Sequence, residues 1–358
     1  MKLHEDKDAF GLLLENIHEK TGYRTDVLEK DYYVLLILQE LSDFQADGLP
    51  AYFKGGTALY KALKTTNRFS EDIDLSVDTR GCSRTQNDKR LERAAKKYVS
   101  LPRDATQGKT NRSEVIAVYT YDPITAFDAD DALQRFGKLK VEATSFTISE
   151  PVDSLEISAM LYNLATEEQK KILETVYDVK PFFIQTITLE RIFVDKLFAA
   201  EAYVRHSSIN QRAFEAAKHI YDLAVIAHHP KVSALLSDSD KLKNLLEIRM
   251  KEEQGRLDGI PGVAPTEFIF FTQAGDNSDV RKAYETMQNQ YVLRKQDRIE
   301  FETAVKALVN IRESLLKNPA WAEDVYKRQP TGGSRSSSVS LGVSPITMMT
   351  MDGDMGIK

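Results

Sequence analysis

The protein is a chain of 358 residues with a net charge of −6, 42% hydrophobic residues and one cysteine, a composition that fits a globular protein and excludes an internal disulfide. The opening "MKLHEDKDAF" lacks the apolar core of a signal peptide, and the longest apolar run, Tyr32 to Leu38, is far shorter than the ~20 residues of a membrane span, so we expect a cytoplasmic protein with no membrane anchor. The acidic balance argues against attraction of nucleic acid to the whole surface, but it leaves room for a local basic groove.

Two helices are expected over residues 9–46, because the apolar residues of this stretch mostly follow helical spacing. The second helix contains "LEKDYYVLLIL", residues 28–38, and Thr25 or Asp26 is its candidate N-cap. Pro50 ends this region.

A compact strand, glycine turn, helix and strand unit follows. "AYF" at 51–53 predicts a short strand, "TALYKAL" at 57–63 a helix, and "EDIDLSV" at 71–77 a strand with period-two alternation. The pattern then predicts a charged helix at 85–98 and strands at 114–121, 137–146 and 182–188. The first half of the chain is therefore mixed α and β.

The second half is almost wholly helical. Helical spacing predicts helices at 189–205, 211–229, 241–253, 279–293 and 299–317. We therefore expect one domain over residues 1–185 and a helical domain over 186–323. Residues 324–329, "DVYKRQ", resemble the translated end of a sequencing adapter, and the following segment is low in complexity, so we expect a non-native or disordered tail over 324–358.

Two carboxylates stand out in the second strand of the glycine unit. Because side chains alternate along a strand, Asp72 and Asp74 share one face, and Ile73 and Leu75 share the other. Like charges so placed repel unless a cation lies between them, and Mg²⁺ prefers hard oxygen ligands of this kind. The pair therefore predicts a metal site.

A third carboxylate and a phosphate-binding turn would complete such a site. Glu142 is the candidate ligand, because it lies on the polar face of the strand predicted at 137–146. Gly55 and Gly56 carry no β-carbons, so backbone N–H groups would approach a triphosphate closely, and Thr57 would add a hydroxyl. Each part has an ordinary alternative, a plain turn or a solvated strand edge, but their order within one short unit is more specific.

The strings "FKGGTALYK" and "RFSEDIDL" resemble the nucleotidyltransferase signature of the AbiEii/AbiGii toxin family, and "LEKDYYVLLIL" is similar to that family's N-terminal helix. The likeness spans roughly residues 25–230. It implies an α+β, polymerase-β-like nucleotidyltransferase fold, with a small mixed sheet and a helical C-terminal half. In that family Asp72 and Asp74 would be the metal ligands, and Ser70 would belong to the Ser-x-Asp element.

The resemblance also implies an activity and partners. The expected protein is a Mg²⁺-dependent toxin of an abortive-infection or toxin–antitoxin system, which transfers a nucleotide from an NTP to an acceptor hydroxyl. The expected acceptor is the 3′ end of tRNA, and the expected partner is a cognate antitoxin, a DNA-binding protein encoded beside it.

Lys196 interrupts the apolar stripe of the helix predicted at 189–205. It either extends out of the stripe to solvent or faces a cleft, where its charge would stabilise a triphosphate. The resemblance favours the second interpretation, because the family's third motif carries a lysine here.

In the next helix the resemblance makes Asp222 of "KHIYDL" a functional residue; the alternative is an exposed carboxylate paired with Lys218. The family form tends to carry Asp where His219 stands, which leaves a role for position 219 open. Arg68 and Arg212 would contact phosphates or lie on the surface.

Two other functions use the same residues. A protein nucleotidylyltransferase would need the same metal site and would modify a hydroxyl on another protein. A non-catalytic module would only bind nucleotide or RNA in the cleft, and its carboxylates would then be dispensable.

Overall fold

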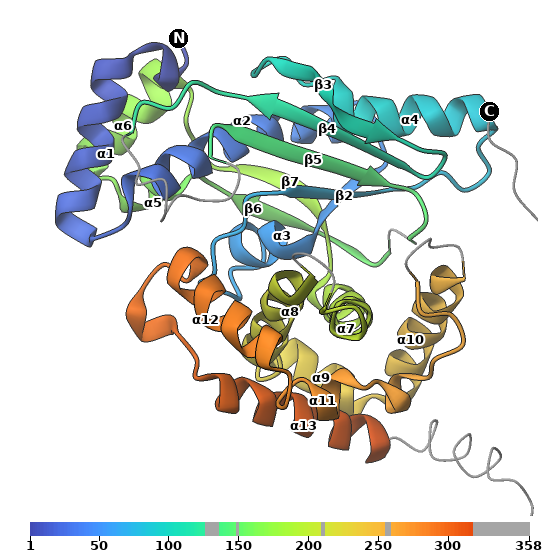
Figure 1. The fold of residues 1–358 in the computed structure, drawn as a ribbon. Helices are drawn as coiled ribbons and strands as arrows, with labels where there is room; N and C mark the ends of the chain where they lie inside the picture. The colour runs from blue at the N-terminus through green and yellow to red at the C-terminus, as the bar shows by residue number, and fades with distance from the viewer. Residues whose placement is uncertain (126–135, 148–149, 209–211, 255–258, 318–358) are drawn as a thin grey trace, which may run out of the picture.

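The computed structural model describes residues 1–125, 136–147, 150–208, 212–254 and 259–317. Its centre is a seven-stranded mixed sheet with the strand order β3-β4-β5-β2-β1-β7-β6 (Figure 1). The strands are β1 (Ala51–Lys54), β2 (Ile73–Val77), β3 (Arg103–Thr110), β4 (Glu114–Thr120), β5 (Lys138–Thr144), β6 (Val152–Ile157) and β7 (Phe182–Ile187). The tail predicted over residues 324–358 lies outside the described residues.

The helices of the first half surround this sheet. They are the 3₁₀ turn η1 (Leu3–Glu5) and the helices α1 (Lys7–Thr21), α2 (Thr25–Ala46), α3 (Gly55–Lys61), α4 (Arg84–Lys96), α5 (Met160–Leu164) and α6 (Glu167–Tyr177). Helix α2 is buried along most of its length and packs against the sheet. Its predicted cap is wrong: the N-cap residue is Arg24, with no side-chain cap, and Thr25 and Asp26 are already helical.

The unit predicted around the glycines forms as a strand, helix and strand. β1 and β2 pair antiparallel with Lys54 opposite Asp74, and α3 connects to β1 directly through Gly55. β5 pairs parallel with β2 on the other side, with Asp74 opposite Glu142. The alternation predicted for β5 is confirmed, because Leu139, Val141 and Ala143 are buried and the residues between them are not fully so.

The sequence pattern did not predict the two edge strands. β3 is exposed along its length, and β6 has only one fully buried residue, Ile157. An edge strand with little buried surface does not require alternating apolar residues, so the sequence pattern that predicts a strand is absent there. The helices α5, α6, α9 and α11 were also not predicted.

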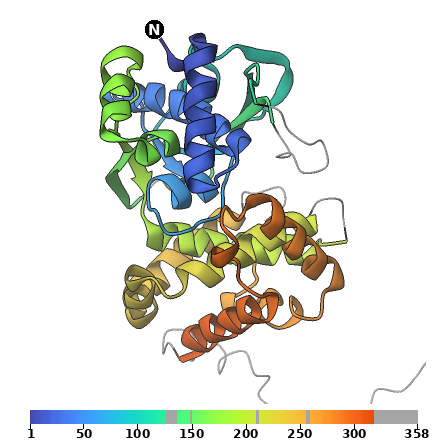
Figure 2. The ribbon, with the colours of Figure 1, turned by 90° about the vertical axis from the view of Figure 1, so that its left-hand side faces the viewer.

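The helical half packs below the sheet (Figures 1 and 2). Its elements are α7 (Leu189–Arg205), α8 (Arg212–Ile226), α9 (Pro230–Ser237), α10 (Ser239–Glu253), η2 (Pro265–Glu267), α11 (Phe270–Gln273), α12 (Ser278–Tyr291), η3 (Lys295–Asp297) and α13 (Phe301–Lys317). Helices α3, α7 and α8 lie between the sheet and helices α9, α11 and α13, with α12 and α10 to either side (Figure 1). The predicted α+β class, a mixed sheet with a helical C-terminal half, is confirmed; the domain boundary near residue 185 stays a prediction.

No helix in the described part of the chain combines the length and the apolar character that a membrane crossing requires.

Candidate active site

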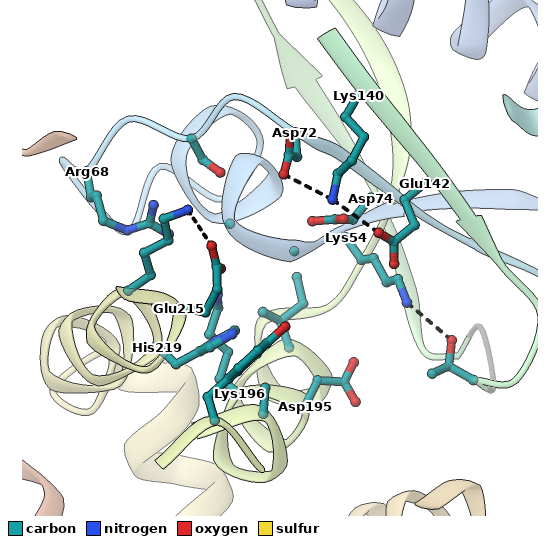
Figure 3. A pocket seen from close by; sticks show the side chains of 18 of the residues that line it. Lys54, Arg68, Asp72, Asp74, Lys140, Glu142, Asp195, Lys196, Glu215 and His219 are labelled. Atoms are coloured by element: carbon teal, nitrogen blue, oxygen red, sulfur yellow. Dashed lines mark hydrogen bonds and ion pairs between the residues drawn. The ribbon is translucent and has the colours of Figure 1, made fainter. Parts of the chain in front are cut away.

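Three carboxylates from neighbouring segments line one pocket. Asp72 directly precedes β2, Asp74 lies within β2, and Glu142 lies opposite Asp74 on β5. All three line a cavity of about 230 Å³ between the sheet and helices α7 and α8 (Figure 3). The strand pairing thus brings together the three acidic residues that the sequence predicted as metal ligands.

The two glycines of the turn allow side chains to approach the backbone closely. Gly55 has a φ of 80°, and a Cβ at this position would lie 2.1 Å from the Oδ2 of Asp74. At Gly56 a Cβ would lie 2.8 Å from the Oγ of Ser70 and 2.9 Å from a guanidinium nitrogen of Arg68. Close packing therefore requires glycine at both positions, which the sequence did not reveal. Both glycines also line the pocket.

Thr57 does not have the position expected of a phosphate ligand. Its side chain is fully buried, and its hydroxyl donates a hydrogen bond to the backbone carbonyl of Asp72. Thr57 therefore holds the segment that carries Asp72 rather than facing the pocket.

Asp222 is buried beneath the pocket and joins two cations of its wall. Arg68 donates to it from Nε at 3.0 Å and from Nη2 at 2.8 Å, and the Nζ of Lys196 lies 2.6 Å from its Oδ2. Burial alone would raise the pKa of Asp222, but the charges of Arg68 and Lys196 outweigh it and hold the pKa well below its usual range.

These contacts decide between the alternatives that the sequence left open for Asp222, Arg68 and Lys196. The exposed carboxylate paired with Lys218 is wrong, because Asp222 is buried and Lys218 instead lies 2.9 Å from Glu215. Arg68 is buried rather than on the surface, and Lys196 lines the pocket rather than extending to solvent. Asp222 acts on the pocket through Arg68 and Lys196.

Position 219, left open by the sequence, also lines the pocket. The His219 ring stacks on Tyr203, with centroids 5.3 Å apart and planes 14° apart, and the guanidinium of Arg212 lies 5.3 Å from the Tyr203 ring. Burial, followed by the charge of Lys196, lowers the pKa of His219 well below its usual value, so this imidazole is neutral at pH 7.

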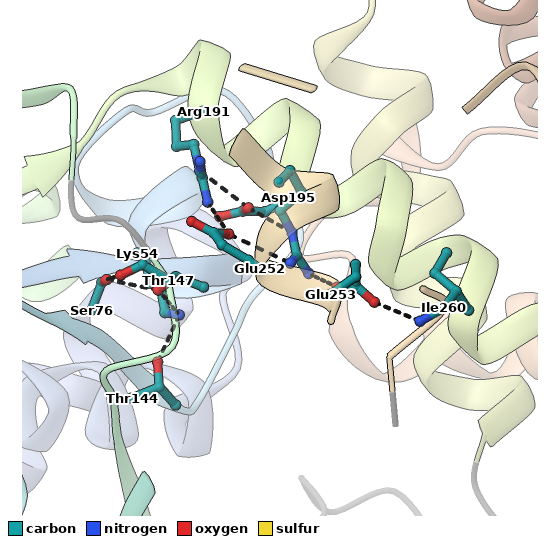
Figure 4. Close-up of polar contacts among 10 residues, drawn as sticks. Lys54, Ser76, Thr144, Thr147, Arg191, Asp195, Glu252, Glu253 and Ile260 are labelled. Atoms are coloured by element: carbon teal, nitrogen blue, oxygen red, sulfur yellow. Dashed lines mark hydrogen bonds and ion pairs between the residues drawn. The ribbon is translucent and has the colours of Figure 1, made fainter. Parts of the chain in front are cut away.

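A buried ion network supports the wall opposite the sheet (Figure 4). The Oδ1 of Asp195, a pocket-lining residue of α7, lies 3.2 Å from Arg191 Nε and 3.1 Å from Arg249 Nε. Both arginines are in turn paired with Glu252. The pairs between α7 and α10 are separated by 54 and 61 positions, so no local spacing predicts them. The pairs within each helix have the three- and four-residue spacing of ordinary surface ion pairs, which does not indicate burial.

Three charged residues of α2 contact the segments that carry the site. Glu29, Lys30 and Asp31 are consecutive and all buried, which is unusual for charged residues. Lys30 pairs with Glu71, the residue before Asp72, and Asp31 accepts from Lys61 of α3 at 2.6 Å. Two of the three charges thus hold the helix that follows the glycine turn and the residue that precedes the aspartates.

The remaining charge of this triad, Glu29, accepts from the backbone of Ile124 and Thr125 at 2.8 and 3.1 Å. In the sequence this stretch was distinguished by its helical spacing and family likeness. Three adjacent charged residues within an apolar helix are a further signal that points to buried, paired charges.

The donor chemistry of the three carboxylates suits a divalent cation. Burial, then the charge of Glu142, raises the pKa of Asp74 to about 6. Among the described residues, His, Cys, Asp and Glu side chains do not form a group of three already arranged around a metal position. The ammonium of Lys140 instead lies 3.2 Å from both Asp72 and Glu142.

Comparison with known protein families gives one match. The family model for the nucleotidyl transferase AbiEii toxin of type IV toxin–antitoxin systems matches residues 36–307. A search of curated proteins gives no match.

Two solved structures are similar at low identity. MenT4, a nucleotidyltransferase toxin from Mycobacterium tuberculosis, is 14% identical with a TM-score of 0.44, over 86% of this chain and 98% of that one. JHP933 from Helicobacter pylori is 16% identical with a TM-score of 0.37, over 85% and 99%. Because the family model covers more than half of the chain, this protein belongs to the AbiEii family of nucleotidyltransferase toxins.

Proposed function

We propose that this nucleotidyltransferase transfers a nucleotide from an NTP to the 3′ end of tRNA, in the cytoplasm, in a reaction that depends on Mg²⁺. The family implies an antitoxin partner, and we propose that a cognate antitoxin neutralises the growth inhibition that this transfer causes. The observation that carries the proposal is the register of β2 and β5, which places Asp74 opposite Glu142 on the wall of a pocket that Gly55 and Gly56 also line.

The residues of the pocket divide into an acidic and a basic side. Asp72, Asp74 and Glu142 would hold Mg²⁺, which when bound neutralises charge on the transferred phosphoryl group. Lys196 and Arg68 lie across from them, on the side of the pocket formed with α7 and α8 (Figure 3). We assign these two cations to the triphosphate, because both present positive charge held in place by the buried Asp222.

The glycines and Ser70 complete the phosphate side. Gly55 and Gly56 leave the space next to Asp74 and Ser70 open, so a phosphate would reach the backbone and the Ser70 hydroxyl there. The chain's own contribution to catalysis is then the positioning of the reactants and the fixed charge around them.

Incubation of the full chain with each ³²P-labelled NTP, Mg²⁺ and total RNA tests the proposal. The expected result is label on a tRNA-sized band that disappears with EDTA and with Asp74→Asn. Label on a protein band would support a protein nucleotidylyltransferase instead. Toxicity that survives Asp72→Ala and Asp74→Asn would show that the pocket only binds its ligand.

A further inference from the structure

Lys140 lies between two of the three carboxylates. It precedes Glu142 by two residues on β5, so both side chains project from the same face of the strand. Its Nζ is 3.2 Å from the Oδ2 of Asp72 and 3.2 Å from the Oε2 of Glu142 (Figure 3). A single ammonium therefore bridges the residue that precedes β2 and the middle of β5 at the acidic side of the pocket.

Three of the other cations that line the pocket have close contacts with other groups, although the charge of Lys54, which lies opposite Asp74, also lowers the pKa of that carboxyl. Arg68 and Lys196 contact Asp222, and Lys54 donates to the hydroxyl of Thr144 at 3.0 Å (Figure 4). The Lys140 ammonium is therefore well placed to offset the repulsion among Asp72, Asp74 and Glu142, the role that a divalent cation would otherwise have.

We propose that Lys140 is a built-in counter-ion that competes with the divalent cation for Asp72 and Glu142. This inference rests on the proposed function, because it concerns the same carboxylates. A cation that binds Asp72 and Glu142 must displace the ammonium, so the free protein binds the metal more weakly than its carboxylates alone would.

Displacement also connects the metal to the nucleotide. The Lys140 side chain lines the same pocket as Lys196 and Arg68, so once displaced it remains near the triphosphate. There the ammonium gains phosphate oxygens as partners in place of the carboxylates. Nucleotide and metal therefore favour each other's binding, and the carboxylates exchange one cation for another without being left unpaired.

The test measures binding of Mn²⁺ to the full chain by electron paramagnetic resonance, without any turnover. Lys140→Met should bind Mn²⁺ about fivefold more tightly than the wild type, the size expected when a partly exposed ion pair no longer has to be broken. Lys138→Met is the matched control, because Lys138 lies on the same strand but is exposed and outside the pocket. It should leave Mn²⁺ affinity unchanged.

A second series adds a non-hydrolysable nucleoside triphosphate analogue. The analogue should increase Mn²⁺ affinity of the wild type several-fold more than that of Lys140→Met, in excess of the metal that the analogue itself binds in solution. Lys140→Gln should behave like Lys140→Met, and thermal melts should show both variants folded.

The outcomes separate this inference from the proposed function. Equal or weaker Mn²⁺ binding by Lys140→Met, with wild-type binding intact, would overturn the counter-ion role and leave the proposed function standing. No Mn²⁺ binding by any variant, with or without the analogue, would overturn both.

Discussion

The Nζ of Lys196 lies 2.6 Å from the Oδ2 of Asp222, although the two residues come from different helices, α7 and α8. Asp222 also binds Arg68 from the segment between α3 and β2, so one buried carboxylate fixes two cations of the pocket wall. The Lys196 ammonium is thus directed by a partner that does not itself line the pocket.

Replacing Asp222 by Asn should damage both the fold and the site. The change leaves two buried cations without their anion, and breaking a buried ion pair in this way costs about 3–5 kcal/mol. Urea unfolding should show that loss, and nucleotide transfer should fall below detection. Asp240→Asn, at an exposed position in the first turn of α10, is the control and should change neither. A stable, active Asp222→Asn would show that the cluster is dispensable.

The same pair predicts how stability depends on pH. Because the pKa of Asp222 is lower in the folded protein than its ordinary value of about 3.9, its contribution is complete above that value and is lost as the pH falls below it. The difference in unfolding free energy between wild type and Asp222→Asn should therefore be constant from pH 7 to about 5 and shrink below about 4. A difference that instead grew on acidification would contradict the assignment.

Gly55→Ala should abolish nucleotide transfer. The added methyl group would lie 2.1 Å from the Oδ2 of Asp74, so the carboxylate has to move from its position opposite Glu142. Gly48→Ala is the matched control: Gly48 also has a positive φ, of 83°, but nothing lies within 4 Å of its Cβ position. It should lose only about 1 kcal/mol of unfolding free energy, from the backbone strain that Ala introduces at this φ, and keep its activity. Equal activity of the two variants would argue against a role for the close contact with Asp74.

Lys30 should be a positioning residue for Asp72. It is buried, pairs with Glu71, and Glu71 also accepts from the hydroxyl of Tyr291. Lys30→Met should lower the unfolding free energy by about 3–5 kcal/mol, because the Glu71 carboxylate stays buried. Where folded protein remains, kcat should fall more than KM rises, because Lys30 does not line the pocket.

A double-mutant cycle separates this ion pair from general packing. Adding Glu71→Gln to Lys30→Met should restore part of the lost stability, since it removes the unpaired charge. Strictly additive losses would show that the two residues act independently. Lys20→Met, at an exposed position in the last turn of α1, should change neither the unfolding free energy nor the activity.

Local pattern accounts for what the sequence predicted well. The strand, turn, helix and strand over residues 51–77 follows from glycines and period-two alternation, both of which act between near neighbours in the chain. The face shared by Asp72 and Asp74 and that of Glu142 follow from the same alternation. The family resemblance was drawn from this stretch and from residues 28–38, and the family model that matches residues 36–307 confirms it.

Only the tertiary structure decided which of these residues lie in contact and which buried ion pairs hold them in place. Arg68 and Asp222 are 154 positions apart, and Lys30 and Glu71 are 41 apart, so no local period relates them. Thr57 reads as a phosphate ligand in the sequence but is turned by packing to the backbone of Asp72. Periodicity assigns a side chain to a face, whereas a buried charge finds its partner only when separate elements pack and exclude water between them.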